Sequence, residues 1–202
     1  MKASITSLLI IFCFTILTSA QTPQDRATEL KEQAQSSLKQ KDYIKARYLF
    51  KKAYEAFAAR ENYPQAIECG VQANALYVRE NFYKEGFELC RDMEQLLWTG
   101  EQNKKKVFYD LRFLINKERL QMYTALKNPA QAKTQLDKLE ETANLAKNDS
   151  LTEALLYTKA NYYYTFNQNT QGDACFRKLI NQYKEKKDYA KVSDCYKNLI
   201  SI

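Results

Sequence analysis

Apolar and polar residues alternate along most of the chain with the period of an α-helix. The clearest stretch is 42–53, where Tyr43 is followed by the small residue Ala46, the aromatic residue Phe50 and the small residue Ala53. These positions are spaced three, four and three residues apart, so they lie on one face of a helix. The pattern predicts an amphipathic helix that packs its apolar face against a neighbouring helix.

The same face recurs three more times, each time with a small residue at its second position. These small residues are 40, 46 and 40 residues apart: Ala46, Gly86, Ala132 and Gly172. A further helical run precedes each face, at about 26–40, 64–78, 104–126 and 151–166. Polar segments separate the runs, and one such break is predicted at 99–103. A self-similar period of this length is typical of helical repeat proteins.

The sequence therefore predicts an all-α fold of antiparallel helical hairpins in one domain, 21–202. Its units are expected at about 26–60, 63–100, 103–147 and 150–184, with a partial unit at 188–202. A glycine inside a helix costs ~1 kcal/mol relative to alanine. Gly86 and Gly172 therefore indicate helix crossings that are too close for a larger side chain. Ser150, followed three residues later by Glu153, has the spacing of a capping box.

The repeats resemble the tetratricopeptide repeat family over about 27–202. The first unit matches best, through Leu30, Ala34, Tyr43, Ala46, Phe50 and Ala53. The other units lack the opening Trp and Leu-Gly pair and the closing proline, and the period is near 40 where that family has 34. The resemblance implies a right-handed superhelix of hairpins, an α-solenoid, whose first helices line a concave groove that binds a protein or peptide.

The resemblance also implies which residues line this groove. In the fourth unit they are Tyr157, Asn161 and Tyr164, at spacings of four and three residues. The corresponding residues of the other units are Lys31, Gln35 and Lys39, then Val71, Ala75 and Val78, then Lys117, Gln121 and Thr124. With lysines at one end and tyrosines at the other, we expect the groove to hold an extended peptide with an acidic terminus.

Composition narrows the function. The 202 residues include 4 glycines, 3 prolines and no histidine. Without histidine, Ser-His-Asp and Cys-His catalysis and nearly all catalytic zinc sites are excluded. No glycine-rich phosphate loop is present, so we expect no cofactor, no metal and no catalysis. An enzyme that uses tyrosine and lysine in the groove is the remote alternative. Lys104, Lys105 and Lys106 indicate a solvated helix start, and we expect no nucleic-acid partner.

The first 20 residues have the order of a secretory signal. Lys2 precedes a short apolar run at 5–17, and Thr18, Ser19 and Ala20 form a small-residue end before Gln21. The run is shorter than the ~20 residues that span a membrane, although an uncleaved N-terminal anchor remains an alternative. No later stretch is apolar enough to span a bilayer. We expect an exported protein, periplasmic or secreted.

Four cysteines follow the predicted signal. Cys69 and Cys90 flank one predicted turn, and Cys175 and Cys195 flank another. Antiparallel helices place such positions opposite each other, so each pair could form a disulfide in an oxidising compartment. The alternative is four small core residues, because free cysteine is among the most buried residue types.

A fifth unit is predicted to start near Asp188, because 188–192 repeats the pattern of 62–66. Its second helix is missing and 199–202 is apolar, so we expect contact either with a missing C-terminal region or with a second copy through the C-terminal helix. The signal and repeats are similar to the exported N-terminal regions of Bacteroidetes sensor proteins. This resemblance implies the input part of a larger signalling protein. A freestanding envelope assembly or structural scaffold is the alternative.

Overall fold

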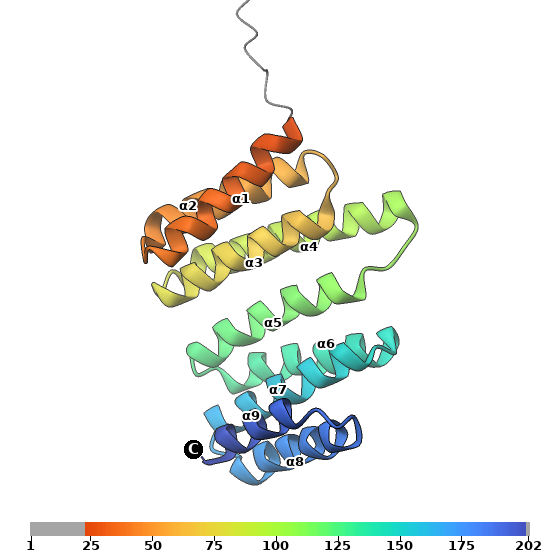
Figure 1. Ribbon diagram of the computed structural model, residues 1–202. Coiled ribbons are helices and arrows are strands. Elements are labelled where there is room, and N and C mark those ends of the chain that lie inside the picture. The colour runs from red at the N-terminus through yellow and green to blue at the C-terminus, as the bar shows by residue number, and fades with distance from the viewer. Residues whose placement is uncertain (1–22, 201–202) are drawn as a thin grey trace, which may run out of the picture.

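The computed structural model describes residues 23–200, which form nine helices and, within that range, no strand. In chain order they are α1 (Pro23–Lys39), α2 (Tyr43–Ala58), α3 (Tyr63–Arg79), α4 (Tyr83–Lys104), α5 (Tyr109–Ala125), α6 (Pro129–Ala146), α7 (Asp149–Thr165), α8 (Asn169–Glu185) and α9 (Tyr189–Ile200). Figure 1 shows them stacked in this order, from α1 and α2 at one end to α8 and α9 at the other. The prediction of an all-α fold is confirmed.

Each helix packs against the next in sequence, and α5 also contacts α3 and α7. The apolar core is divided into three clusters along the stack. The first includes Phe50 and Phe57 of α2, the second includes Phe113 of α5, and the third includes Phe176 of α8. Helix α5 belongs to two of them, since Ile115 lies in the first cluster and Phe113 in the second. The core is therefore continuous from one repeat to the next, as expected when a single hairpin cannot bury its own apolar face.

The turns between helices share one construction, in which the chain passes through a left-handed residue. These residues lie 20 to 24 positions apart: Lys41, Glu61, Asn81, Lys105, Lys127, Lys147, Asn167 and Lys187. At the first of them, the Asp42 N–H donates to the Ser37 carbonyl at 2.9 Å, and the same bond from Asp188 to Tyr183 measures 2.8 Å. This is the Schellman termination of a helix. The structural half-repeat is thus about 20 residues, two to each hairpin.

At several turns the residue after the left-handed position also caps the next helix. The side chains of Asp42, Asn62 and Asn128 accept hydrogen bonds from the backbone N–H groups three residues further on. One residue therefore ends one helix with its backbone and caps the next with its side chain. This double use keeps the turns short and aligns consecutive helices along each other.

One predicted break is wrong. The sequence predicts a turn at 99–103, but α4 continues through this segment to Lys104. Gly100 and Glu101 are buried, and a Cβ atom at Gly100 would lie 2.9 Å from the Tyr63 ring. Tertiary packing thus holds a polar segment helical. The 46-residue spacing between the second and third units reflects this long α4 and the connection at 105–108.

The small residues at the second position of each face are all buried: Ala46, Gly86, Ala132 and Gly172. A Cβ atom at Gly86 would lie 2.8 Å from Met122 Sδ, and one at Gly172 would lie 2.7 Å from the Tyr164 ring. The sequence predicts close backbone approach at both glycines. The nearest atoms belong instead to side chains, which fill the space that a Cβ would need.

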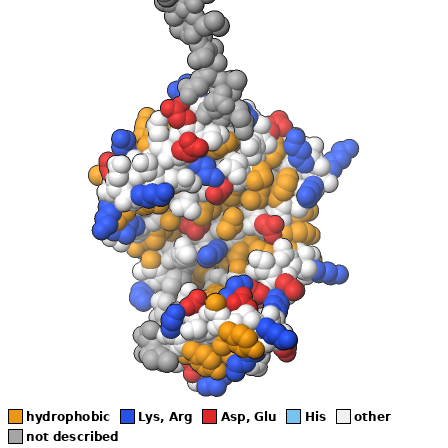
Figure 2. Space-filling view, viewed as in Figure 1, with side chains coloured by type: hydrophobic (Ala, Val, Ile, Leu, Met, Phe, Trp, Pro, Cys, Tyr) orange, Lys and Arg blue, Asp and Glu red, His pale blue; other side chains and the backbone are white. Residues whose placement is uncertain are grey.

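The predicted signal at 1–20 lies outside the described residues, as do Ser201 and Ile202 of the apolar C-terminal segment. In the part that the structure covers, no helix is both long and apolar enough to cross a membrane. Figure 2 shows lysine and arginine side chains projecting at both edges of the molecule, where the turns of Figure 1 lie. On the face shown, many of the positively charged side chains therefore lie near the ends of the helices.

Candidate functional site

A pocket of about 330 Å³ lies between α5 and α7. Its lining residues come from α5, from α7 and from the turn after α5: Lys117, Leu120, Gln121, Thr124, Ala125, Lys127, Thr158, Asn161, Tyr162 and Thr165. Apart from Leu120 and Ala125, every lining side chain carries a hydrogen-bonding group. Among the described residues that line it, none is acidic.

Four of the predicted groove residues that carry polar or charged ends meet in this pocket: Lys117, Gln121, Thr124 and Asn161. Gln121 and Asn161 are 40 residues apart, occupy the same repeat position and are both exposed. Within residues 23–200, the amide groups of these two side chains form no hydrogen bond with the protein. A primary amide offers two donor hydrogens and one acceptor oxygen, which is what the backbone of an extended peptide requires.

The charge of the pocket is positive. Lys117 and Lys127 line it, and neither forms an ion pair within the described part of the chain. Lys117 also acts on the carboxyl group of its neighbour Glu118, which is buried. Burial raises the pKa of Glu118, and this effect outweighs the opposing influences of its hydrogen bond with Asn74 and of Lys117. Both lysines are therefore available to a carboxylate from outside the chain.

The first-unit groove residues are arranged differently. Lys31 Nζ lies 2.8 Å from Gln65 Oε1 and 2.8 Å from Glu68 Oε2, both on α3. Its charge is therefore neutralised across the gap between α1 and α3. Gln35 lines two pockets there, of about 230 Å³ and about 320 Å³, and Lys39 is exposed at the end of α1.

The second-unit groove residues, on α3, are apolar. Val71 and Val78 are half-buried and pack against the first core cluster, and Ala75 between them is exposed. They offer no hydrogen-bonding side chain, so this part of the predicted groove contributes surface without polar recognition.

Tyr157 and Tyr164 do not join the pocket, contrary to expectation. Tyr157 places its hydroxyl 3.3 Å from Cys195 Sγ on α9, and its ring meets Phe176 edge-on. Tyr164 donates to Asp173 Oδ1 at 2.7 Å and stacks on Phe176. Both rings thus pack against α8 or α9. Of the three groove residues predicted on α7, Asn161 alone lines the pocket.

The four cysteines are free and buried in this structure, so neither disulfide is formed in it. Burial raises the pKa of Cys69 and of Cys90 to about 12. Burial raises the pKa of Cys175 and of Cys195 as well. At neutral pH all four are thiols in the core, as in the alternative that treats them as small core residues.

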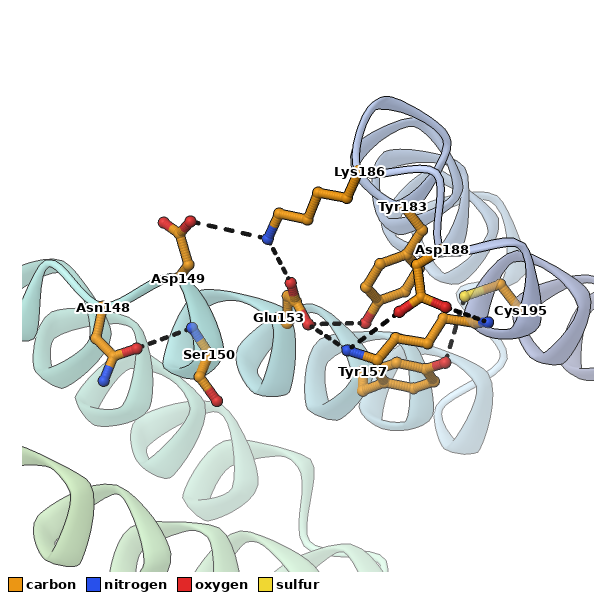
Figure 3. Close-up of polar contacts among 10 residues, drawn as sticks. Asn148, Asp149, Ser150, Glu153, Tyr157, Tyr183, Lys186, Asp188 and Cys195 are labelled. Atoms are coloured by element: carbon orange, nitrogen blue, oxygen red, sulfur yellow. Dashed lines mark hydrogen bonds and ion pairs between the residues drawn. The ribbon is translucent and has the colours of Figure 1, made fainter.

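Glu153 is predicted to complete a capping box with Ser150, but it is instead the centre of a polar cluster. The capping box is absent, because α7 begins at Asp149 and the Asn148 side chain accepts from the Ser150 N–H. Glu153 instead reaches the last turn of the stack, where it accepts hydrogen bonds from Lys186 at 2.8 Å, Tyr183 at 3.1 Å and Lys191 at 3.3 Å (Figure 3). This cluster ties α7 to the end of α8 and the start of α9.

Sequence analysis also misses a buried polar pair between α3 and α5. Asn74 Nδ2 donates to Glu118 Oε2 at 2.9 Å, and the two residues are 0% and 4% exposed. Asn74 Oδ1 is buried without a partner among the described residues. A signal for this pair was present: Glu118 falls three residues after Ile115 and four before Met122, on the core face of α5.

Comparisons of the chain with protein-family models, with curated proteins and with solved structures found no match. The evidence for binding therefore comes from the chain's own geometry. Two features of it are specific enough to support one. They are the hydrogen-bonding and positively charged pocket between α5 and α7, and the regular stack of helices that holds it.

Proposed function

We propose that this protein is a non-catalytic helical repeat scaffold that binds an extended peptide or protein segment between α5 and α7. The observation that carries the proposal is the convergence of Lys117, Gln121 and Asn161 on one pocket without an acidic lining residue among those described. The two amides suit a peptide backbone, and the lysines Lys117 and Lys127 suit a carboxylate at the end of that peptide.

The stack supports a superhelical arrangement of tetratricopeptide type. Each helix packs against the next along the chain, and the first helices of neighbouring units touch, α3 with α5 and α5 with α7. In a right-handed superhelix of such hairpins, the first helices line the concave surface. The α5–α7 pocket lies between two of them and would belong to that surface.

The state of the thiols supports a non-catalytic role. The thiolate is the nucleophilic form of cysteine, and the raised pKa values of Cys69 and Cys90 keep both protonated at neutral pH. Neither side chain lies at the surface. Binding, which needs only the polar side chains of the pocket, is the simpler use of this fold.

We also propose that the protein works outside the cytoplasm, as the input part of a larger signalling protein. The support is the signal-like order of residues 1–20 and the resemblance to exported Bacteroidetes sensor regions. Mass spectrometry of the protein isolated from its own cells should find Gln21 as the first residue. A protein that retains Met1 to Ala20 would contradict cleavage. The signalling role is tested by reading the native gene beyond the codon for Ile202, where we expect the rest of a signalling protein.

The binding proposal is tested with a pool of random octapeptides passed over the immobilised protein. We expect peptides with a free C-terminal carboxylate to be retained more strongly than the same pool with amidated ends. Lys117→Glu should remove this preference, because it replaces a cation of the pocket by an anion. Lys51→Glu makes the same change at an exposed position of α2 and is the matched control.

Two results would count against the proposal. One is equal retention of the free and the amidated pools. The other is equal loss in Lys117→Glu and Lys51→Glu, which would mean that only the overall charge attracts peptides. Gln121→Ala and Asn161→Ala then distinguish the amide groups of the pocket from its lysines. Each variant should weaken retention of the free and the amidated pools alike, because it removes a contact to the peptide backbone.

A further inference from the structure

A second crevice, of about 330 Å³, opens where the repeat is irregular. It is lined by residues of α4, α5 and α6, and it shares no lining residue with the α5–α7 pocket. Leu97 and Ile115 are buried at its base. The long α4 and the connection at 105–108 interrupt the regular spacing here, so side chains that a regular repeat would cover stay open.

One wall of the crevice is held by an ion pair between the buried Glu101 and the exposed Arg112. Glu101 is 6% exposed and accepts hydrogen bonds from Arg112 Nε at 2.8 Å and from the Phe108 N–H at 2.9 Å. A second bond joins Arg112 Nη2 to the other carboxylate oxygen. A carboxylate that is paired this fully fixes the end of α4 against the start of α5. The crevice is therefore pre-formed.

Two large apolar side chains line the crevice and are exposed. Trp98 of α4 is 62% exposed and Leu145 of α6 is 57% exposed. Trp98 is the only tryptophan of the chain. Tryptophan and arginine are among the residue types that most often carry the binding energy of a protein interface, typically in a pocket surrounded by a polar rim. Here Trp98 and Arg112 lie together in such a setting.

The polar rim carries both signs of charge. Lys138 and Glu141 are both exposed and lie about one helical turn apart on α6, in the lining of the crevice. Neither forms an ion pair within the chain as far as the structure describes it. A surface that carries one unpaired cation beside one unpaired anion is complementary in charge to a second copy of the same surface. When two α6 helices meet antiparallel, Lys138 of each can face Glu141 of the other.

The size and position of the crevice agree with this. A volume of about 330 Å³ is near the lower limit of small-molecule sites, and it suits one large side chain. A two-fold symmetric interface requires that a protruding side chain and the hollow that receives it lie on the same surface. Trp98 and the crevice meet this requirement.

We propose that the α4–α6 crevice is the contact surface of a symmetric homodimer. Each copy inserts Trp98 into the crevice of the other, and Lys138 of each copy pairs with Glu141 of its partner copy. This surface is distinct from the C-terminal helix, and it leaves the α5–α7 pocket open. The dimer thus presents two peptide-binding surfaces, although its formation does not depend on peptide binding.

The proposal predicts association that Trp98 itself reports. Analytical ultracentrifugation of the full chain should show a concentration-dependent dimer. On dilution the tryptophan emission should move to longer wavelength as Trp98 returns to water. Trp98→Ala should weaken dimerisation roughly thirty-fold, as expected for a residue that carries much of an interface's energy. A chain that stays monomeric over the concentration range would overturn the proposal.

A charge exchange tests the pairing directly. Lys138→Glu and Glu141→Lys should each weaken dimerisation, because each leaves only like charges to face one another. Mixing these two variants should restore dimers. One chain then carries two glutamates at these positions and the other carries two lysines, so both contacts between unlike chains are attractive. Only a pairing between these two positions predicts the rescue, and its absence overturns the proposed geometry.

Two control variants keep the result specific. Ile44→Glu on α2 and Tyr196→Glu on α9 change exposed apolar residues away from the crevice and should leave association unchanged. Dissociation by Tyr196→Glu in place of Trp98→Ala would assign the dimer to the C-terminal helix and overturn the proposal. Circular dichroism shows for each variant that the helices are still formed.

Discussion

The gap between α1 and α3 and the gap between α5 and α7 are built from equivalent residues but differ in charge. Lys31 and Gln35 of α1 correspond to Lys117 and Gln121 of α5, each 86 positions later. Lys31 is bonded to Glu68. The residue that corresponds to Glu68 in α7 is Ala154, which offers no carboxylate, so Lys117 stays unpaired.

This difference shows how a repeat protein makes one of several similar gaps into a binding surface. The first two groove residues are the same in both units. What changes is the residue on the neighbouring helix that either neutralises the lysine or leaves it free. Function in such a fold is decided by the pairing between units as much as by the residues at a given repeat position.

The largest expected effect concerns the seam between the two gaps, where α4 packs against α3 and α5. Gly86 of α4 lies against Asn74 of α3 and Met122 of α5, so close that a Cβ would displace the end of the Met122 side chain. Gly86→Leu should destabilise the protein by about 3 kcal/mol, as overpacked core sites do. Urea unfolding followed by circular dichroism measures it. Gly86→Ala, which Met122 can accommodate by moving its flexible end, should cost less. A loss within ~0.5 kcal/mol for leucine would show that the seam is loose.

Much of the helical architecture could be predicted from the sequence, because helical periodicity and turn residues are local signals. The small residues Ala46, Gly86, Ala132 and Gly172 could be recognised for the same reason. The end of α4 could not be, since 99–103 looks polar and is helical because Gly100 packs on Tyr63. A local sequence pattern cannot predict a contact between residues as far apart in the chain as Tyr63 and Gly100.

The site was predicted in part for a related reason. Lys117, Gln121 and Asn161 belong to the same repeat face, so the period alone places them on one surface. Tyr157 and Tyr164 flank Asn161 on the same helical face, yet they pack against α8 and α9. Which edge of a helical face is covered depends on how the next helix crosses it. The angle of that crossing is set by packing between helices, and it cannot be predicted from the period of the sequence.

The second prediction transfers the pairing of the first gap to the second. Ala154→Glu places a carboxylate where Glu68 stands relative to Lys31, so it should neutralise Lys117. Retention of free-carboxylate peptides should fall roughly ten-fold, the loss expected for one charged hydrogen bond. Ala154→Gln is the control of equal size without charge, and it should keep the preference. Equal losses in both variants would mean that shape, and not charge, excludes the peptide.

The third prediction compares two equivalent carboxylates. Glu118 of α5 is buried, whereas its counterpart Glu32 of α1 is exposed. Burial raises the pKa of Glu118 above its ordinary value, with Asn74 and Lys117 opposing in part. The folded protein therefore holds this proton at pH values where the unfolded chain has released it. The stability that Glu118 contributes is complete below its unfolded pKa and is lost as pH rises through the folded value.

Removing the charge should accordingly stabilise the protein at neutral pH. Glu118→Gln should stabilise the protein more near pH 7 than at pH 4, because an amide does not have to ionise in the core. Urea unfolding over this pH range measures the difference from the unmodified protein. Glu32→Gln should show no such trend. If Glu118→Gln gives the same difference in stability at every pH, the carboxyl group keeps an ordinary pKa and the buried pair is wrongly described.

The smallest effect is expected from freeing the lysine of the first gap. Glu68 is about half exposed, and partly exposed ion pairs contribute little. Glu68→Ala should therefore change the free energy of unfolding by no more than ~0.5 kcal/mol. It should nevertheless make Lys31 available beside Gln35 and give the α1–α3 gap a weak preference for free-carboxylate peptides. This preference is best measured in a Lys117→Glu background, where the α5–α7 pocket no longer prefers free-carboxylate peptides.

A gain of binding in Glu68→Ala would show that pairing alone separates the two gaps. The α1–α3 gap holds pockets of about 230 Å³ and about 320 Å³, and the α5–α7 pocket measures about 330 Å³. If no binding appears although Lys31 is free, the shape of the α1–α3 gap also excludes the peptide. The difference between the two regions then lies in the spacing of their helices as well as in their charge.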